Sequence, residues 1–155
     1  MISTIKIYWD TGANIKFLKE HYGCCDFLQY PYDSSDRPKN KKMSLARPSN
    51  LPWKYAHSTW EESTFTWDEC VGSELYSQIT NVVGKSNERD ILHIDSAYKS
   101  GCHIFLTSDK GDIWSKRADL EKICNLKIFH SNDPKQHETI LQYIKELRRV
   151  FDIHH

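Results

Sequence analysis

The chain has 155 residues, and its 21 basic and 21 acidic residues give a formal net charge of zero. The length predicts a single domain over residues 1–155, and the charge balance excludes binding of nucleic acid through a global positive field. No apolar run is long enough to span a membrane, and five cysteines without disulfide-scaffold spacing predict a reduced, cytoplasmic chain with no membrane partner.

The chain opens with a strand that runs into an acidic residue. Residues 5–9 are rich in β-forming side chains, and Asp10-Thr11-Gly12 follows them. A strand, an acid and then a helix is a geometry that builds sites, but Asp is also a good helix cap, so both roles stay open for Asp10. We expect a first helix over 13–22, ended by Gly23, and an extended segment over 24–30.

The segment 33–50 has the most loop-like composition, because Pro, Ser, Asn and charged residues dominate it. It also carries the dense basic run of the chain: Arg37, Lys39, Lys41, Lys42 and Arg47. A solvated loop and a phosphate-gripping loop both fit this run. The following stretch, 52–67, is rich in aromatic residues, which favour a core or an interface over base stacking. Within it, residues 63–67 alternate as a strand does.

The stretch 72–109 predicts two helices and a buried strand. The first helix covers 72–83, and the second begins at Asp90 and ends at Gly101, where a left-handed residue fits. Residues 104–106 form a short strand covered on both faces, and Asp109 follows it. A helix antiparallel to that strand brings the carboxylates of Asp90 and Asp109 to one edge of the sheet.

The last part of the chain predicts a helix over 112–124, a strand over 126–129 and a final amphipathic helix after Pro134. Strands that alternate with helices indicate an α/β fold. We therefore expect a three-layer α/β/α domain with a short, mostly parallel central sheet of about four or five strands.

The spacing Asp90-x6-Ala97-x3-Gly101, followed by an apolar strand and Thr107-x-Asp109, resembles the C-terminal signature of PIN-domain nucleases. This family includes the toxin ribonucleases of toxin–antitoxin pairs. The opening strand with Asp10-Thr11 is similar too, although Gly12 stands where the family often has Asn or Ser. The resemblance implies a metal-dependent endoribonuclease, toxin or defence related, with the catalytic acids Asp10, Glu74, Asp90 and Asp109.

The middle acid of this set is the least determined by the resemblance. Glu74 fits best by position, Glu69 is the second choice, and Glu61 and Glu62 are more distant ones. Glu74 also suits the first turn of a helix on electrostatic grounds alone.

Hydrolysis of a phosphodiester at neutral pH needs an activated water and neutralised phosphate charge, and a divalent ion supplies both. Mg²⁺ or Mn²⁺ prefers carboxylate oxygens, so the expected ligands are Asp10, Asp90, Asp109 and Asp112. Asp112 is equally suited to cap the helix that it begins. His93 lies roughly 60° from Asp90 around the helix, so it either orients a carboxylate or packs; Asp95, roughly 140° away, belongs elsewhere.

RNA is the expected partner, with single-stranded DNA as the other polymer and Arg37, Lys39, Lys41 and Lys42 as the substrate-binding residues. The resemblance further implies a cognate antitoxin or regulator and a homodimer. The main alternative is a catalytically inactive PIN-like module that binds RNA or protein. A phosphate-transfer receiver ranks third, because it needs a pair of acids after the first strand and Asp10 has no acidic neighbour.

Overall fold

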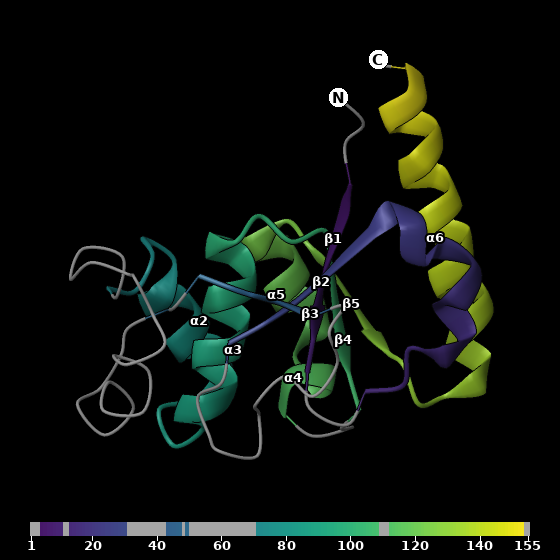
Figure 1. Ribbon diagram of the computed structural model, residues 1–155. Coiled ribbons are helices and arrows are strands. Elements are labelled where there is room, and N and C mark those ends of the chain that lie inside the picture. Colours follow the sequence, from purple (N-terminus) through teal and green to yellow (C-terminus); the bar gives the residue numbers. More distant parts are fainter. Residues whose placement is uncertain are drawn as a thin grey trace.

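The chain folds around a five-stranded sheet in which each neighbouring pair of strands is parallel (Figure 1). The computed structural model describes residues 4–10, 13–30, 43–47, 49, 71–108 and 112–153. The strands are β1 (Ile5–Trp9), β2 (Cys25–Gln29), β3 (Met43–Leu45), β4 (Ile104–Thr107) and β5 (Lys127–His130). Their order across the sheet is β3-β2-β1-β4-β5.

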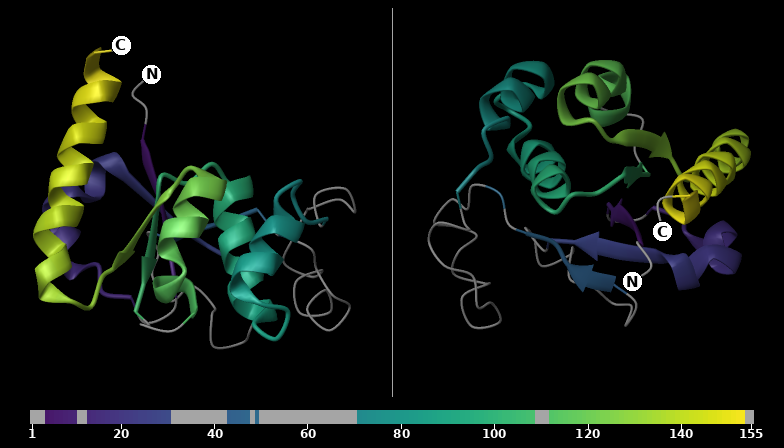
Figure 2. Two further views of the ribbon diagram at one scale, coloured as in Figure 1. Left: turned by 180° about the vertical axis from the view of Figure 1, so that it is seen from behind. Right: turned by 90° about the horizontal axis from the view of Figure 1, so that it is seen from above.

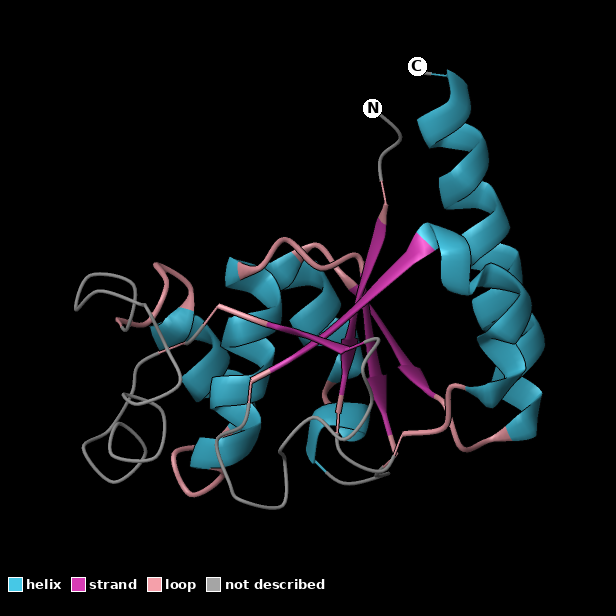
Figure 3. Ribbon diagram, viewed as in Figure 1, coloured by secondary structure: helices cyan, strands magenta, loops and turns pink. Residues whose placement is uncertain are grey.

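Helices cover both faces of this sheet. They are the 3₁₀ helix η1 (Lys16–Cys24), α2 (Tyr76–Val83), α3 (Glu88–Lys99), α4 (Asp112–Ser115), α5 (Arg117–Cys124) and α6 (Pro134–Ile153). The helices α2, α3 and α5 lie on one face, and η1 and α6 lie on the other (Figure 2). The strands therefore form the middle layer (Figure 3), which confirms the predicted α/β fold with a short parallel sheet.

Period-two alternation along the strands divides the core into two halves. Tyr8, Phe105 and Ile128 face α2, α3 and α5. The residues that precede or follow them, such as Ile7 and Leu106, face η1 and α6. The central strands β1 and β4 are buried on both sides, as expected for a parallel sheet.

The strand order places a topological switch point at the centre of the sheet. From β1 the chain moves outward to β2 and β3 on one side, and it later adds β4 and β5 on the other side. The connections that leave the carboxyl ends of β1 and β4 therefore run in opposite directions. This arrangement opens a crevice for ligands in parallel α/β sheets.

Some local expectations were wrong. The first helix is a 3₁₀ helix that begins at Lys16 and passes through Gly23. The prediction missed this because the spacing of the apolar residues does not distinguish three residues per turn from 3.6. The expected helix over 112–124 is split at Lys116 into α4 and α5. The predicted loop 33–50 contains β3, a three-residue strand that pairs with β2. The expected strand 63–67 and the aromatic stretch around it lie outside the described residues.

The described part of the chain contains no helix with the length and apolar character needed to cross a bilayer.

Candidate functional site

Asp10 stands at the switch point, immediately after β1. Its backbone N–H continues the ladder to β4 by donating to the Leu106 carbonyl at 3.1 Å. Thr107 at the end of β4 donates from Oγ1 to Asp10 Oδ2 at 3.4 Å. Since Tyr8 faces α3, the period of two directs Asp10 to the same face of the sheet. The carboxylate is thus held at the carboxyl edge, on the side that α3 covers.

A buried hydrogen bond fixes α3 against β1. The Tyr8 hydroxyl and His93 Nδ1 lie 2.6 Å apart, and the Tyr30 N–H donates to the same hydroxyl at 3.2 Å. His93 is 2 % exposed, so it is a packed histidine, as one of the two sequence interpretations expected.

This bond also sets the position of Asp90. Asp90 precedes His93 by three residues, about 4.5 Å along the helix axis, and Asp10 follows Tyr8 by two, about 6.6 Å along the strand. Both steps lead toward the carboxyl edge, because the first turn of α3 and the ends of β1 and β4 lie at the same edge (Figure 1). The structure therefore brings Asp10 and Asp90 to one end of the sheet.

The remaining acids expected at this edge cannot be placed. Asp109 follows Ser108 in the sequence and lies outside the described residues, and Asp112 begins α4 but its side chain is not described. The same holds for Glu61, Glu62 and Glu69 and for the basic run: Arg37, Lys39, Lys41 and Lys42. Within the part that is described, no group of three or more His, Cys, Asp or Glu could hold a metal ion.

Glu74 does not join the other acids, and its assignment to the site is wrong in this structure. Its exposed carboxylate accepts a hydrogen bond from the Tyr98 hydroxyl at 2.5 Å. That bond holds the pKa of Glu74 below its usual value and raises the pKa of Tyr98. Tyr98 lies in the last turn of α3, about 12 Å along the axis from Asp90. Glu74 is therefore near the opposite end of that helix.

Asp95 is fully buried, and its carboxylate stabilises the fold by binding two neighbouring segments. Its carboxylate accepts hydrogen bonds from Ser49 Oγ at 2.5 Å, from the Ser73 N–H at 3.1 Å and from the Ser73 hydroxyl. It therefore fastens the segment after β3 and the segment before α2 to the same helix. The sequence left Asp95 either exposed or bonded elsewhere; the structure shows that it is bonded away from Asp90 and buried.

Two residues of the edge were missed by the sequence interpretation. Tyr8 positions α3, and His130, which pairs with Thr107 at the end of β5, extends the row that begins at Asp10 and Thr107. Alternation along each strand could have identified such residues, because every second residue counted back from the strand end lies on the same face of the sheet. It could not identify His130, because the expected strand ended at residue 129.

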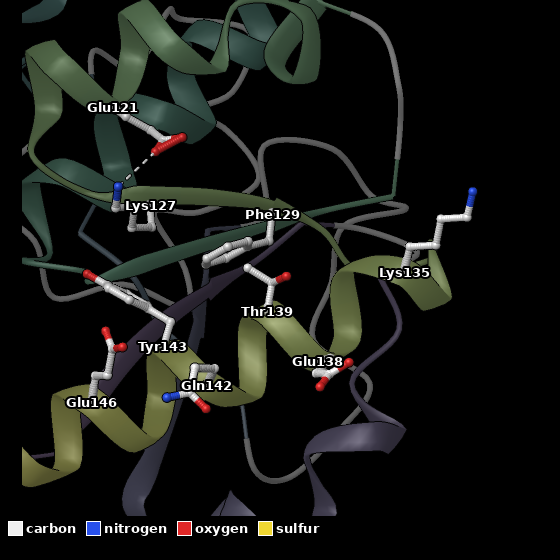
Figure 4. Close-up of a pocket in the computed structure, with 9 residues that line it drawn as sticks. All are labelled: Glu121, Lys127, Phe129, Lys135, Glu138, Thr139, Gln142, Tyr143 and Glu146. Atoms are coloured by element: carbon white, nitrogen blue, oxygen red, sulfur yellow. Dashed lines mark ion pairs between the residues drawn. The ribbon is translucent and has the colours of Figure 1, made fainter.

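A groove lies between β5 and α6 (Figure 4). This groove has a volume of about 620 Å³ and is lined by Glu121, Lys127, Phe129, Lys135, Glu138, Thr139, Gln142, Tyr143 and Glu146. Lys127 Nζ pairs with Glu121 Oε2 at 3.6 Å, and burial together with Glu121 and Glu146 raises the pKa of Tyr143. Cationic and anionic side chains are mixed here, and Phe129 faces the α6 side of the sheet. The groove is thus separate from the acids at the carboxyl edge.

The fold and this edge define an α/β protein with a parallel sheet and an aspartate, Asp10, at its switch point. Comparison with protein-family models, with curated proteins and with solved structures found no match for this chain.

Proposed function

We propose that the chain is a metal-dependent endoribonuclease of PIN type, with its active site at the carboxyl edge of β1 and β4. The observation that carries the proposal is the position of Asp10 at the switch point, held by the Thr107 hydroxyl, with Asp90 in the first turn of α3 at the same edge of the sheet. Ligand sites of parallel α/β sheets occur at this place. The sequence spacing that resembles the PIN signature supports the same assignment independently.

The donor chemistry of this edge fits Mg²⁺ or Mn²⁺, because Asp10 and Asp90 both offer carboxylate oxygens. Asp10 and Asp90 hold the ion in this proposal, and Asp109 and Asp112 are the further ligands that the sequence suggests. When bound, the ion acidifies a water molecule and neutralises phosphate charge.

The chain's own residues hold the reacting groups in position. Thr107 orients the Asp10 carboxylate through its hydroxyl. His93 and Tyr8 hold α3 against β1, and Asp90 lies one turn before His93 on that helix. Such fixed placement matters because catalytic groups lose efficiency when they move by about 1 Å.

Partners and location follow from the proposed activity. The substrate is RNA, with single-stranded DNA as the competing polymer, and the basic run Arg37, Lys39, Lys41 and Lys42 grips its phosphates. A nuclease of this kind acts in the cytoplasm and needs a regulator, such as a cognate antitoxin. The resemblance also implies a second copy of the chain as a partner, in a homodimer.

The test is cleavage of fluorescent single-stranded RNA and DNA with Mn²⁺ or Mg²⁺, compared with EDTA. Asp10→Asn and Asp90→Asn remove one ligand each and should lower the cleavage rate at least about 100-fold. Asp119→Asn is the matched control, because Asp119 is an exposed aspartate on α5. Circular dichroism confirms that each variant is folded.

A folded, metal-loaded wild type that cuts neither polymer would overturn the nuclease proposal for these substrates. Equal cutting by wild type and both variants would remove the site assignment. In the first case the alternative, an inactive PIN-like module that binds RNA or protein, becomes the leading explanation.

A further inference from the structure

Trp114 and Arg117 form a preorganised pair beside the candidate active site. The Arg117 guanidinium carbon lies 4.0 Å from the centroid of the Trp114 ring, and Arg117 Nη1 donates to the Trp114 carbonyl at 2.9 Å. Stacking and a backbone bond thus hold a guanidinium group that is exposed to solvent. One of its five N–H donors is used in this bond.

This pair is connected to Asp10 through a row of side chains at the ends of neighbouring strands. Asp10 accepts from Thr107, Thr107 pairs with His130, and the His130 ring meets Trp114 edge to face with centroids 5.8 Å apart. Adjacent strands are about 4.8 Å apart, so His130 lies about 10 Å from Asp10 across the sheet. Trp114 belongs to α4, which lies at this same edge (Figure 1).

The charge of Arg117 is not neutralised within the part of the chain that the structure describes, where no carboxylate lies within ion-pair distance of it. Arg117 is a positive group that is held in place, and it lies beyond His130 on the same edge of the sheet as Asp10. This position suits a polyanion that passes from the metal site onto α4 and α5.

His130 supplies a second observation at this position. The residue is 5 % exposed, and among the described residues its buried Nδ1 atom has no hydrogen-bond partner. Buried polar atoms are almost always paired in folded proteins, so an orphan atom requires an explanation. The described residues thus leave a polar group unsatisfied at the His130 end of the row.

We propose that Arg117 binds a backbone phosphate of the substrate strand on the β5 side of the cut, with Trp114 as the residue that positions its guanidinium. The proposal rests on the proposed function for its substrate class, a single-stranded nucleic acid. It assigns the direction in which that strand crosses the sheet, from Asp10 over Thr107 and His130 to α4.

The experiment measures binding of a fluorescent single-stranded RNA by anisotropy at several salt concentrations. The Asp10→Asn chain with Mg²⁺ serves as the background, so that the RNA stays uncut. Arg117→Ala should weaken binding roughly five- to tenfold and lower the salt slope by about one. Arg149→Ala is the matched control, an exposed arginine near the end of α6, and should change neither value.

Trp114 is tested by a conservative and a drastic substitution. Trp114→Ala should weaken binding as Arg117→Ala does, and Trp114→Phe should restore most of it, because a ring remains under the guanidinium. Circular dichroism separates a loss of binding from a loss of folding, and Arg117→Ala alone decides the matter if Trp114→Ala does not fold.

Equal affinity and salt slope for Arg117→Ala and its background would overturn the inference, as would equal losses in Arg117→Ala and Arg149→Ala or no RNA binding at all. The experiments distinguish failure of the proposed function from failure of this inference. If the wild type binds RNA through Arg117 but does not cut it, the nuclease proposal is contradicted and the Arg117 subsite is supported. If the wild type cuts RNA and Arg117→Ala has no effect, the nuclease proposal is supported and the subsite is contradicted.

Discussion

The hydrogen bond between Tyr8 and His93 is the residue-scale contact on which the candidate site depends. Tyr8→Phe removes the hydroxyl that His93 Nδ1 and the Tyr30 N–H share in the buried core. Loss of one partner of a buried hydrogen bond costs about 1–3 kcal/mol. We therefore expect the free energy of unfolding, measured with denaturant, to fall by that amount.

Tyr98→Phe is the control for this change, because it also deletes one tyrosine hydroxyl. Tyr98 belongs to α3, whereas Tyr8 packs against that helix. Its bond to Glu74 is exposed, so its loss should change the free energy of unfolding by less than about 0.5 kcal/mol. Equal effects of the two substitutions would contradict the central role given to Tyr8.

His103 predicts how stability depends on pH. Burial and the nearby charge of Lys6 lower the pKa of His103, whose Nδ1 accepts a hydrogen bond from the Lys6 N–H at 3.0 Å. Below about pH 6.5 the unfolded state therefore binds more protons than the folded state does. The free energy of unfolding should fall as the pH drops through this value toward the folded pKa.

The measurement is denaturant unfolding at about pH 7.5 and about pH 5.5, on either side of the ordinary histidine pKa. The wild type should lose more stability between these values than His103→Gln does, since glutamine does not titrate. An identical loss in both proteins would show that His103 does not contribute to the pH dependence.

At the scale of elements, two left-handed residues end helices next to the sheet. Gly101 (φ 72°) follows α3 and Asn125 (φ 53°) follows α5. A Cβ at Gly101 would meet no atom within 4 Å, so Gly101→Ala costs only the backbone strain of about 1–2 kcal/mol. Asn125→Gly relieves that strain and should leave the free energy of unfolding unchanged or slightly higher.

Thermal and denaturant unfolding of the two variants checks this contrast. A Gly101→Ala chain as stable as the wild type would mean that the turn into β4 adopts another conformation. The sequence predicted the left-handed turn at Gly101, since glycine after an apolar helix is a strong signal. It did not predict the turn at Asn125, where no glycine marks the helix end.

Elements with long periodic patterns were predictable, and short ones were not. The strand at 5–9 and the final helix from Pro134 match the structure closely, because many residues contribute to each pattern. β3 has three residues and owes its conformation to pairing with β2, which the local sequence does not encode. The break between α4 and α5 falls at Lys116, where no Pro or Gly in the sequence indicates the end of a helix.

At the scale of the whole molecule, the strand order decides which acids meet. Asp10 and Asp90 were predicted to converge because each adjoins a strand or helix end at the carboxyl edge. In the structure, Asp10 follows β1 and Asp90 lies in the first turn of α3, at the same end of the sheet. Glu74 was assigned by its place in the family pattern alone, and the fold puts it near the other end of α3. Topology thus predicts which ends of the elements share an edge, whereas position along the chain did not predict where Glu74 lies.

The most direct test of the central claim is calorimetric titration of Mn²⁺ into the wild type, Asp10→Asn, Asp90→Asn and the control Asp119→Asn. The account predicts saturable binding by the wild type and the control, weakened at least about tenfold in each of the other two, since every carboxylate ligand adds to divalent-ion affinity. No binding by the folded wild type, or equal binding by all four proteins, would contradict a metal site at the carboxyl edge of β1 and β4.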